Sequence, residues 1–222
     1  MCGRYTQTAA PENLVFRFGL EDRGVKLKPR YNIAPGQQSP VVIEEASIKA
    51  LMLMYWGLVP SWSKDPTIGN RMINARAETL TEKRSFKRLL PKRRCLVLAD
   101  GFYEWRKARH GKIPMRYVLK DKEPFSFAGL WDIWKQPYGE ELRSFTIITT
   151  EANDLLKPVH DRMPVILLKE DEDKWLDPGL KDPAKLTPLL KSYPSDRMET
   201  YDVSTIVNSP MNDRPECIQE AI

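Results

Sequence analysis

The sequence has few of the residues that build cross-linked or metal-bound proteins, with 3 cysteines and 2 histidines among 222 residues. The cysteines, Cys2, Cys95 and Cys217, are odd in number and far apart, which argues against a framework of disulfides. No CxxC or HxxxH pair is present, so a zinc site built from cysteine and histidine is nearly excluded. We therefore expect no metal and no cofactor.

Long apolar runs are also missing. The longest, over residues 51–56, is far shorter than the roughly 18 residues that a membrane-spanning helix needs. The opening MCGRYTQT has neither a basic nor an apolar stretch, so we expect no secretory signal and no membrane association. The net charge of +5 is compatible with a polyanionic partner. These features predict a soluble protein of the cytoplasm.

Proline is abundant, with 18 residues spread along the chain, and it divides the sequence into short elements. Helical spacing appears only over residues 11–18, 171–176 and 183–190. Short apolar or β-branched runs predict strands over residues 40–43, 48–56, 94–98, 115–119, 125–128 and 145–149. Many strands without a βαβ rhythm predict an α+β fold: one domain over residues 1–222, with a mostly antiparallel, barrel-like sheet and short peripheral helices.

The second residue is a cysteine, and its small side chain should permit removal of Met1. Removal would leave an α-amine and a thiol on one residue, with reference pKa values of about 8 and about 8.5. Such an aminothiol condenses with an aldehyde to an imine and then closes a thiazolidine ring. It can also act as a hydrolase nucleophile with its own amine as the base. The plain alternative is a cysteine without function at a frayed end.

Two later clusters place polar groups among apolar ones. In residues 72–78, Asn74 and Arg76 share a face if the segment is extended, and Arg76 is positioned to pair with Glu78; a solvated strand end is the alternative. In residues 100–105, a strand that begins at Phe102 would direct Glu104 to the same side as Phe102. Apolar surroundings would then raise the pKa of Glu104 and suit it to acid–base work, unless it is a surface residue.

His160 is the candidate histidine, because it precedes two charged residues in a loop bounded by Pro158 and Pro164. A structural histidine is the alternative interpretation, and His110, in a basic turn, is expected to be solvated. Arginines lie beside each cluster, and Trp62 stands in a loop. Arginines that bind phosphates and aromatic side chains that stack on bases are typical of a groove that binds single-stranded nucleic acid. Tryptophans in the core and arginines on the surface would explain the same residues without a ligand.

Six segments in order and spacing resemble the SRAP family, the SOS-response-associated peptidases or abasic-site processing proteins. The matching segments are residues 1–4, 31–35, 56–60, 73–78, 101–105 and 160–164, with a weaker match at Val207 and Asn208. The resemblance implies a protein of the DNA damage response that senses abasic sites in single-stranded DNA and captures them covalently. It implies four catalytic residues, with Cys2 as nucleophile, Asn74 for orientation, Glu104 for proton transfer and His160 for stabilising the opened sugar.

The resemblance also implies DNA contacts. Phosphates would be held by arginines and bases stacked on tryptophans, with two further residues as walls of the groove: Arg4, Arg76 and Arg162; Trp62 and Trp105; Pro35 and Thr149. Two other functions stay open. One is a cysteine peptidase acting on itself or on other proteins, and the imine would also allow lyase activity. The other is a binding module for single-stranded DNA in which Cys2 plays no part.

Overall fold

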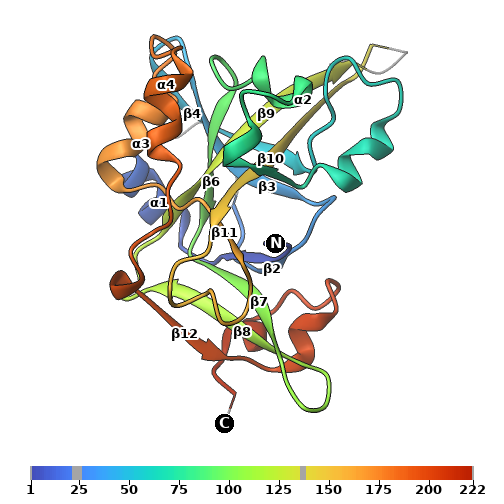
Figure 1. The fold of residues 1–222 in the computed structure, drawn as a ribbon, viewed down its shortest axis with the longest axis vertical. Coiled ribbons are helices and arrows are strands. Elements are labelled where there is room, and N and C mark those ends of the chain that lie inside the picture. The colour runs from blue at the N-terminus through green and yellow to red at the C-terminus, as the bar shows by residue number, and fades with distance from the viewer. Residues whose placement is uncertain (1, 22–26, 136–138, 222) are drawn as a thin grey trace.

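The computed structural model describes residues 2–21, 27–135 and 139–221, and strands dominate it (Figure 1). The strands are β1 Tyr5–Gln7, β2 Arg30–Ile33, β3 Gln38–Glu45, β4 Ile48–Trp56, β5 Asn74–Arg76, β6 Arg94–Ala99, β7 Gly101–Lys107, β8 Lys112–Leu119, β9 Phe125–Lys135, β10 Glu141–Glu151, β11 Arg162–Pro164 and β12 Met198–Asp202. The α-helices are α1 Pro11–Phe18, α2 Arg84–Lys87, α3 Lys169–Leu176 and α4 Pro183–Leu186. Short 3-10 turns lie between them, among them η1 Pro66–Arg71, η2 Ala77–Thr79 and η3 Thr187–Leu189.

Five strands close a barrel. They follow the order β10-β4-β3-β6-β9, and β9 pairs back onto β10. The pairs that β10 makes with β4 and β5 are parallel, whereas β3–β4, β3–β6, β6–β9 and β9–β10 are antiparallel. The short strands β5 and β11 attach to β10 outside the ring. This arrangement confirms the predicted α+β fold with a mostly antiparallel, barrel-like sheet.

A second sheet of order β12-β8-β7-β1-β2 lies below the barrel in Figure 1. All its pairs are antiparallel, and β1 joins β7 with Tyr5 opposite Phe102. The backbone N–H of Tyr103 donates to the carbonyl of Arg4 at 3.0 Å, which extends this pairing toward the N-terminus. The first residues of the chain are therefore held against β7.

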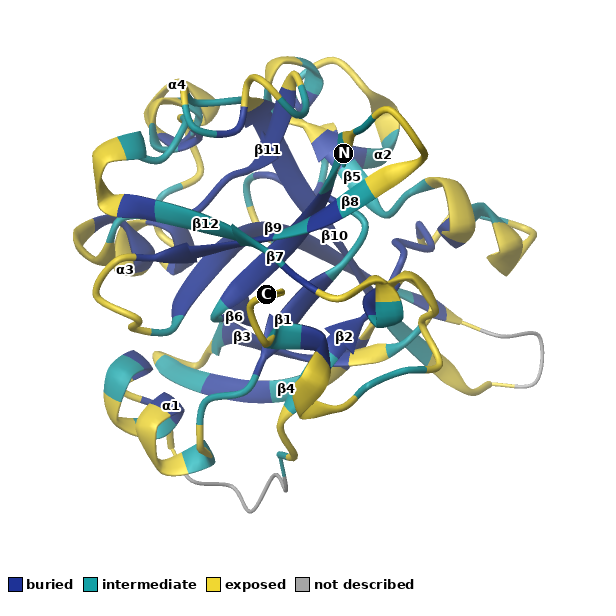
Figure 2. Cartoon of the chain, turned by 90° about the horizontal axis from the view of Figure 1, so that it is seen from below, coloured by how far each residue is buried: buried dark blue, intermediate teal, exposed yellow. Residues whose placement is uncertain are grey.

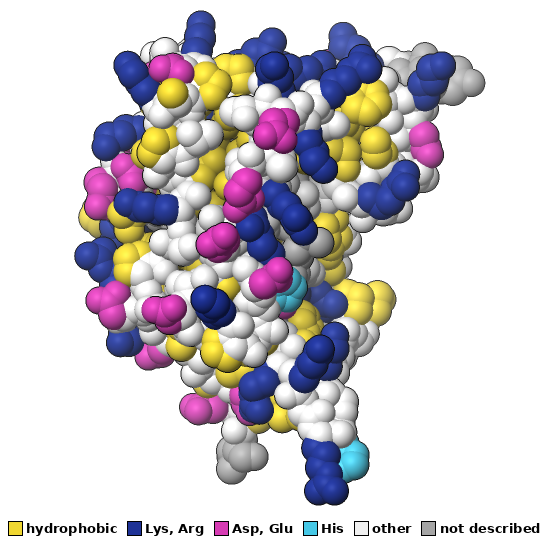
Figure 3. All heavy atoms as spheres, in the orientation of Figure 1, with side chains coloured by type: hydrophobic (Ala, Val, Ile, Leu, Met, Phe, Trp, Pro, Cys, Tyr) yellow, Lys and Arg dark blue, Asp and Glu magenta, His cyan; other side chains and the backbone are white. Residues whose placement is uncertain are grey.

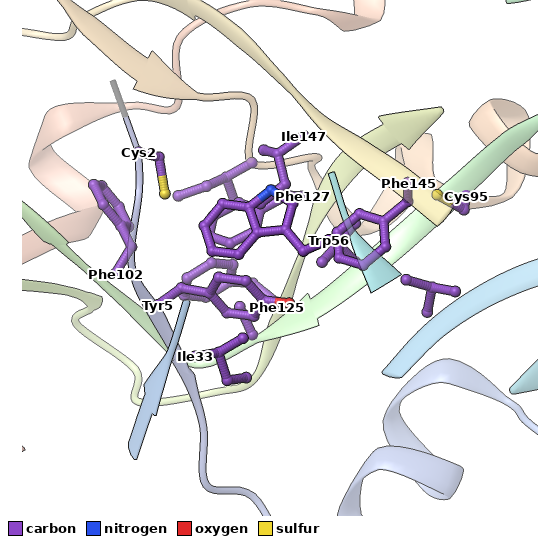
Figure 4. Packing of buried hydrophobic residues seen from close by; sticks show 14 of the residues in the cluster. Cys2, Tyr5, Ile33, Trp56, Cys95, Phe102, Phe125, Phe127, Phe145 and Ile147 are labelled. Atoms are coloured by element: carbon purple, nitrogen blue, oxygen red, sulfur yellow. The ribbon is translucent and has the colours of Figure 1, made fainter. Parts of the chain in front are cut away.

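The two faces of β7 pack into different cores. Phe102 joins Cys2, Tyr5 and the aromatic residues of the barrel (Figure 4). Tyr103 faces the other way, into a small cluster with Val207. Helices α1 and α3 cover another face of the barrel through a third cluster, and their outer sides are exposed (Figure 2).

Some predicted helices and strands begin and end at the predicted residues, whereas others are longer than predicted or interrupted. The predicted strand 48–56 and helix 11–18 coincide with β4 and α1. The predicted helix 183–190 is wrong in its second half, where η3 replaces the α-helix. Pro188 has no N–H to continue the α-helical ladder, so the chain tightens there. No helix in the described ranges is long and apolar enough to cross a membrane.

Candidate active site

Cys2 is fully buried at the edge of the aromatic cluster, with its sulfur on the side of Phe102 (Figure 4). The side-chain amide of Asn74 donates to the Cys2 carbonyl at 2.8 Å. Asn74 begins β5, which lies parallel to β10 with Asn74 opposite Ile147. The barrel thus fixes the amide, and the amide fixes the backbone of the second residue.

Burial raises the pKa of the Cys2 thiol, and the negative charge of Glu104 raises it further. The thiolate, not the thiol, is the strong nucleophile. In this buried setting the thiol keeps its proton at neutral pH. A group that accepts this proton must therefore take part when the sulfur reacts.

Glu104 is a carboxyl whose negative charge acts on the Cys2 thiol. It lies on β7 on the same face as Phe102, as the alternation predicted, and is 6% exposed. Burial raises the pKa of Glu104, and the positive charges of His160, when protonated, and Lys112 oppose that rise. A raised pKa favours the protonated carboxyl, which can donate a proton, and the carboxylate left behind can accept one.

His160 lies in the loop that leads into β11. Its Nδ1 accepts a hydrogen bond from the backbone N–H of Arg162 at 3.0 Å, which in the neutral ring leaves the proton on Nε2. The same Nδ1 lies 2.8 Å from Asp161 Oδ1, a contact that is favourable when the ring is protonated. Glu104 and His160 line one cavity of about 540 Å³. The structure therefore brings together these two predicted acid–base residues.

Arg162 and Thr149 are buried beside this group. The guanidinium of Arg162 makes two hydrogen bonds to the carboxylate of Glu78, at 2.8 and 2.9 Å, and a third to the Thr149 carbonyl at 2.7 Å. The expected pairing of Glu78 with Arg76 is therefore corrected: Glu78 pairs with Arg162, because η2 turns the chain toward β11. The hydrogen bonds from Arg162 lower the pKa of Glu78. As DNA contacts, Arg162 and Thr149 stay predictions.

Arg4 and Trp105 lie together on the adjoining sheet. Arg4 donates to Asn32 Oδ1 at 2.7 Å and to the Val207 carbonyl at 2.9 Å, and its guanidinium carbon lies 5.8 Å from the centre of the Trp105 ring. Trp105 Nε1 donates to Asn208 Oδ1 at 2.7 Å. Sequence reasoning gave Asn32 no role, although it stands in one of the matching segments. An isolated asparagine at the end of a short strand carries no local signal.

Three predicted DNA contacts, Pro35, Trp62 and Arg76, are exposed. Trp62 is 41% exposed in the turn before η1, with the guanidinium of Arg84 5.3 Å from its ring centre. The other tryptophans apart from Trp105 are buried, so the interpretation of tryptophans as core residues holds for those and fails for Trp62: Trp56, Trp131, Trp134 and Trp175.

The described part of the chain holds no group of three or more histidine, cysteine, aspartate or glutamate side chains that would bind a metal ion. The candidate site relies on an aminothiol residue, a carboxyl and an imidazole. Each belongs to a segment that resembles the same family.

The family described as SOS response associated peptidase (SRAP) has a model that matches residues 1–210, and the chain belongs to this family. This confirms the resemblance seen in the sequence. Abasic site processing protein YoqW of Bacillus subtilis (strain 168) is 46% identical over 223 residues, which cover 99% of each chain. Abasic site processing protein HMCES of Xenopus tropicalis is 34% identical over 269 residues, with 100% of this chain and 79% of the relative covered. A crystal structure of a protein from Bacteroides thetaiotaomicron superposes with a TM-score of 0.90 at 32% identity over the full length of both chains.

Proposed function

We propose that this protein processes abasic sites in single-stranded DNA by forming a covalent crosslink through Cys2 after Met1 is removed. The names of the relatives support abasic DNA as the substrate. The observation that carries the covalent step is the placement of Cys2: its carbonyl is held by Asn74, and its thiol lies within the field of the buried Glu104.

The proposed reaction uses both groups of the terminal cysteine. The free α-amine adds to the aldehyde of the ring-opened sugar, and loss of one water gives an imine. The sulfur then bonds to the carbon of the protonated imine as the thiol gives up its proton, which yields a neutral thiazolidine. While Met1 is attached, the Cys2 nitrogen is an amide and cannot add in this way. Removal of Met1, by self-processing or by another enzyme, therefore precedes capture.

The raised pKa of Glu104 and the hydrogen bond to His160 Nδ1 give these two residues definite tasks. Ring opening of the sugar needs a proton moved from the hydroxyl to the ring oxygen, and dehydration of the carbinolamine needs an acid. Glu104, buried but able to exchange a proton, would supply this acid and then accept the thiol proton. His160, with Nδ1 held by the Arg162 amide, would present Nε2–H to the opened sugar.

Closing the ring also diverts the imine from β-elimination of the 3′ phosphate. The crosslink would then shield the strand from breakage, which fits a role in the DNA damage response. Among the proposed DNA contacts, Arg76 and Trp62 are exposed and need no rearrangement. Arg4 and Arg162 already hold protein partners, so a phosphate would have to share or displace them.

The direct test mixes the Met-free protein with an oligonucleotide that carries one abasic site and resolves the products on a denaturing gel. We expect a heat-stable shifted band with the natural chain and none with Cys2→Ala. A normal yield from Cys2→Ala would contradict the mechanism.

A second variant separates the amine from the thiol. Inserting one alanine between Met1 and Cys2 keeps the thiol but moves the α-amine to another residue, so a thiazolidine cannot form. We expect this variant to give no heat-stable band. A band equal to that of the natural chain would favour thiol chemistry alone, and equal binding of intact and abasic strands without any band would favour a simple binding module.

A further inference from the structure

Two lysines face each other at the end of the β7–β8 hairpin. Lys107 pairs with Lys112 in the antiparallel register, and the turn between them closes with a hydrogen bond from the Ala108 N–H to the Gly111 carbonyl at 3.1 Å. Both lysines are exposed, and neither forms an ion pair with any residue in the described ranges. Figure 3 shows basic side chains gathered at this lower end of the molecule.

This pairing is unfavourable for the hairpin itself. Side chains directly opposite each other in an antiparallel pair lie close, and like charges there destabilise it. Arg106, the next residue along, is by contrast matched with Asp202 at 2.9 Å. The fold therefore balances a neighbouring charge on the same hairpin but leaves two ammonium groups side by side.

The same lysines line the cavity that holds Glu104 and His160. That cavity also contains a second carboxylate, Asp161. The carboxylate of Asp161 would repel a nucleic acid strand from the acid–base residues that must reach its sugar. Lys107 and Lys112 offset this negative charge, and the positive charge of Lys112 also acts on Glu104.

We propose that Lys107 and Lys112 form a phosphate subsite that holds the DNA backbone next to the abasic nucleotide. This inference rests on the proposed function and extends it to the hairpin. A phosphodiester between the two ammonium groups would relieve their repulsion, and lysine acts as a point charge toward phosphate. Trp105, half-buried in the same cavity, adds an aromatic face for a neighbouring base.

The test measures non-covalent binding, so that it does not depend on Cys2 chemistry. The probe is a fluorescent single strand with tetrahydrofuran in place of the abasic sugar, which has no aldehyde. Its Kd is measured by anisotropy at several salt concentrations. For Lys107→Gln/Lys112→Gln we expect about tenfold weaker binding at 0.1 M salt and a log Kd–log salt slope shallower by about 0.7, the value for one lost phosphate contact on a single strand.

The matched control is Lys181→Gln/Lys185→Gln, which removes the same charge from exposed lysines beside and within α4, at the opposite end of the molecule (Figure 1). We expect its slope to equal that of the natural chain. Equal losses in both double variants, or an unchanged slope in the hairpin variant, would overturn the subsite.

One further variant separates folding from binding. Lys112→Glu places opposite charges across the hairpin, so we expect unfolding in urea to be unchanged or shifted to higher urea while the affinity falls further than with glutamine. Retained affinity in a stable Lys112→Glu protein would overturn the proposal. If the Cys2 crosslink fails but the slope changes as expected, the subsite stands and the covalent mechanism is wrong; a crosslink with no change in slope means the reverse.

Discussion

Glu104 is one of several buried carboxylates, and its charged neighbours differ from those of two others. Glu172 and Asp132 accept hydrogen bonds from arginines, Arg17 and Arg88 respectively, whereas the positive charges that act on Glu104 include those of His160 and Lys112. Glu104 sits on β7 between the second residue of the chain and a cavity open to solvent. Burial there raises its pKa from an ordinary value of 4.5, which favours the neutral acid.

The raised pKa makes a prediction about stability. A carboxyl whose pKa is higher in the folded state stabilises the fold fully below its unfolded pKa, and this contribution is lost as the pH rises through the folded value. Glu104→Gln has no proton to lose. We therefore expect the free energy of unfolding of the natural chain to fall relative to Glu104→Gln as the pH rises above the unfolded pKa of about 4.3, as measured by urea unfolding.

The same substitution should slow capture. General acid–base groups contribute typically 10²- to 10⁴-fold, so the single-turnover rate of crosslinking should fall by about 10²-fold or more with Glu104→Gln. If Glu104→Gln gains stability relative to the natural chain as the pH rises and also crosslinks more slowly, Glu104 is an acid–base residue of the reaction. A pH-independent difference in unfolding, with an unchanged rate, would assign Glu104 a purely structural place.

At the level of elements, barrel closure depends on Gly129. This residue of β9 is paired with Cys95 on β6 and with Ile147 on β10, so strands approach it from both sides. A methyl group at this position would lie 2.8 Å from the Cys95 sulfur and 3.2 Å from the Thr146 carbonyl oxygen. At this position the closed barrel therefore has room for the hydrogen of glycine but not for a larger side chain.

Gly129→Ala should therefore destabilise the protein, by about 1–3 kcal/mol, because overpacking forces side chains and backbone apart. Cys95→Ala removes the nearest atom, so the double variant should recover part of this loss. A double-mutant cycle in urea measures the recovery. Strictly additive effects of the two substitutions would show that the contact with Cys95 does not limit the closure.

On the scale of the whole molecule, the two ends of the chain are tied together around Asn32. Its side-chain amide donates to three carbonyls near the C-terminus, at 2.7 to 3.1 Å, and its carbonyl oxygen accepts from Arg4. Asp213 adds hydrogen bonds to the backbone N–H groups of Tyr31 and Asn32. The position of the N-terminal segment that carries Cys2 thus depends on residues 207–213.

Asn32→Ala should cost about 2–3 kcal/mol of unfolding free energy, since buried carbonyls and Arg4 lose their partner. Asn32→Asp should cost more, because a carboxylate would face three carbonyl oxygens. Urea unfolding of both variants gives the comparison. An aspartate variant as stable as the natural chain would mean that the C-terminal segment moves away from Asn32 without loss.

The sequence by itself determined the elements whose signals are local. The alternation in β7 predicted correctly that Phe102 and Glu104 share a face, and Pro11 with its following apolar residues predicted α1. Both patterns depend on neighbours within a few positions. The linear order of short motifs determined the family, because motif order and spacing survive without knowledge of the fold.

The tertiary structure alone decided which distant groups meet. Glu78 and Arg162 are 84 positions apart, and local spacing offered Arg76 as the partner instead. Asn32 carried no local signal, because the carbonyls that accept hydrogen bonds from its amide lie 175 to 180 positions away. The physical reason is the same in both cases. The alternation of residues within a strand determines the face on which a side chain lies, but only the closed barrel and the register of its strands determine which residues that side chain contacts.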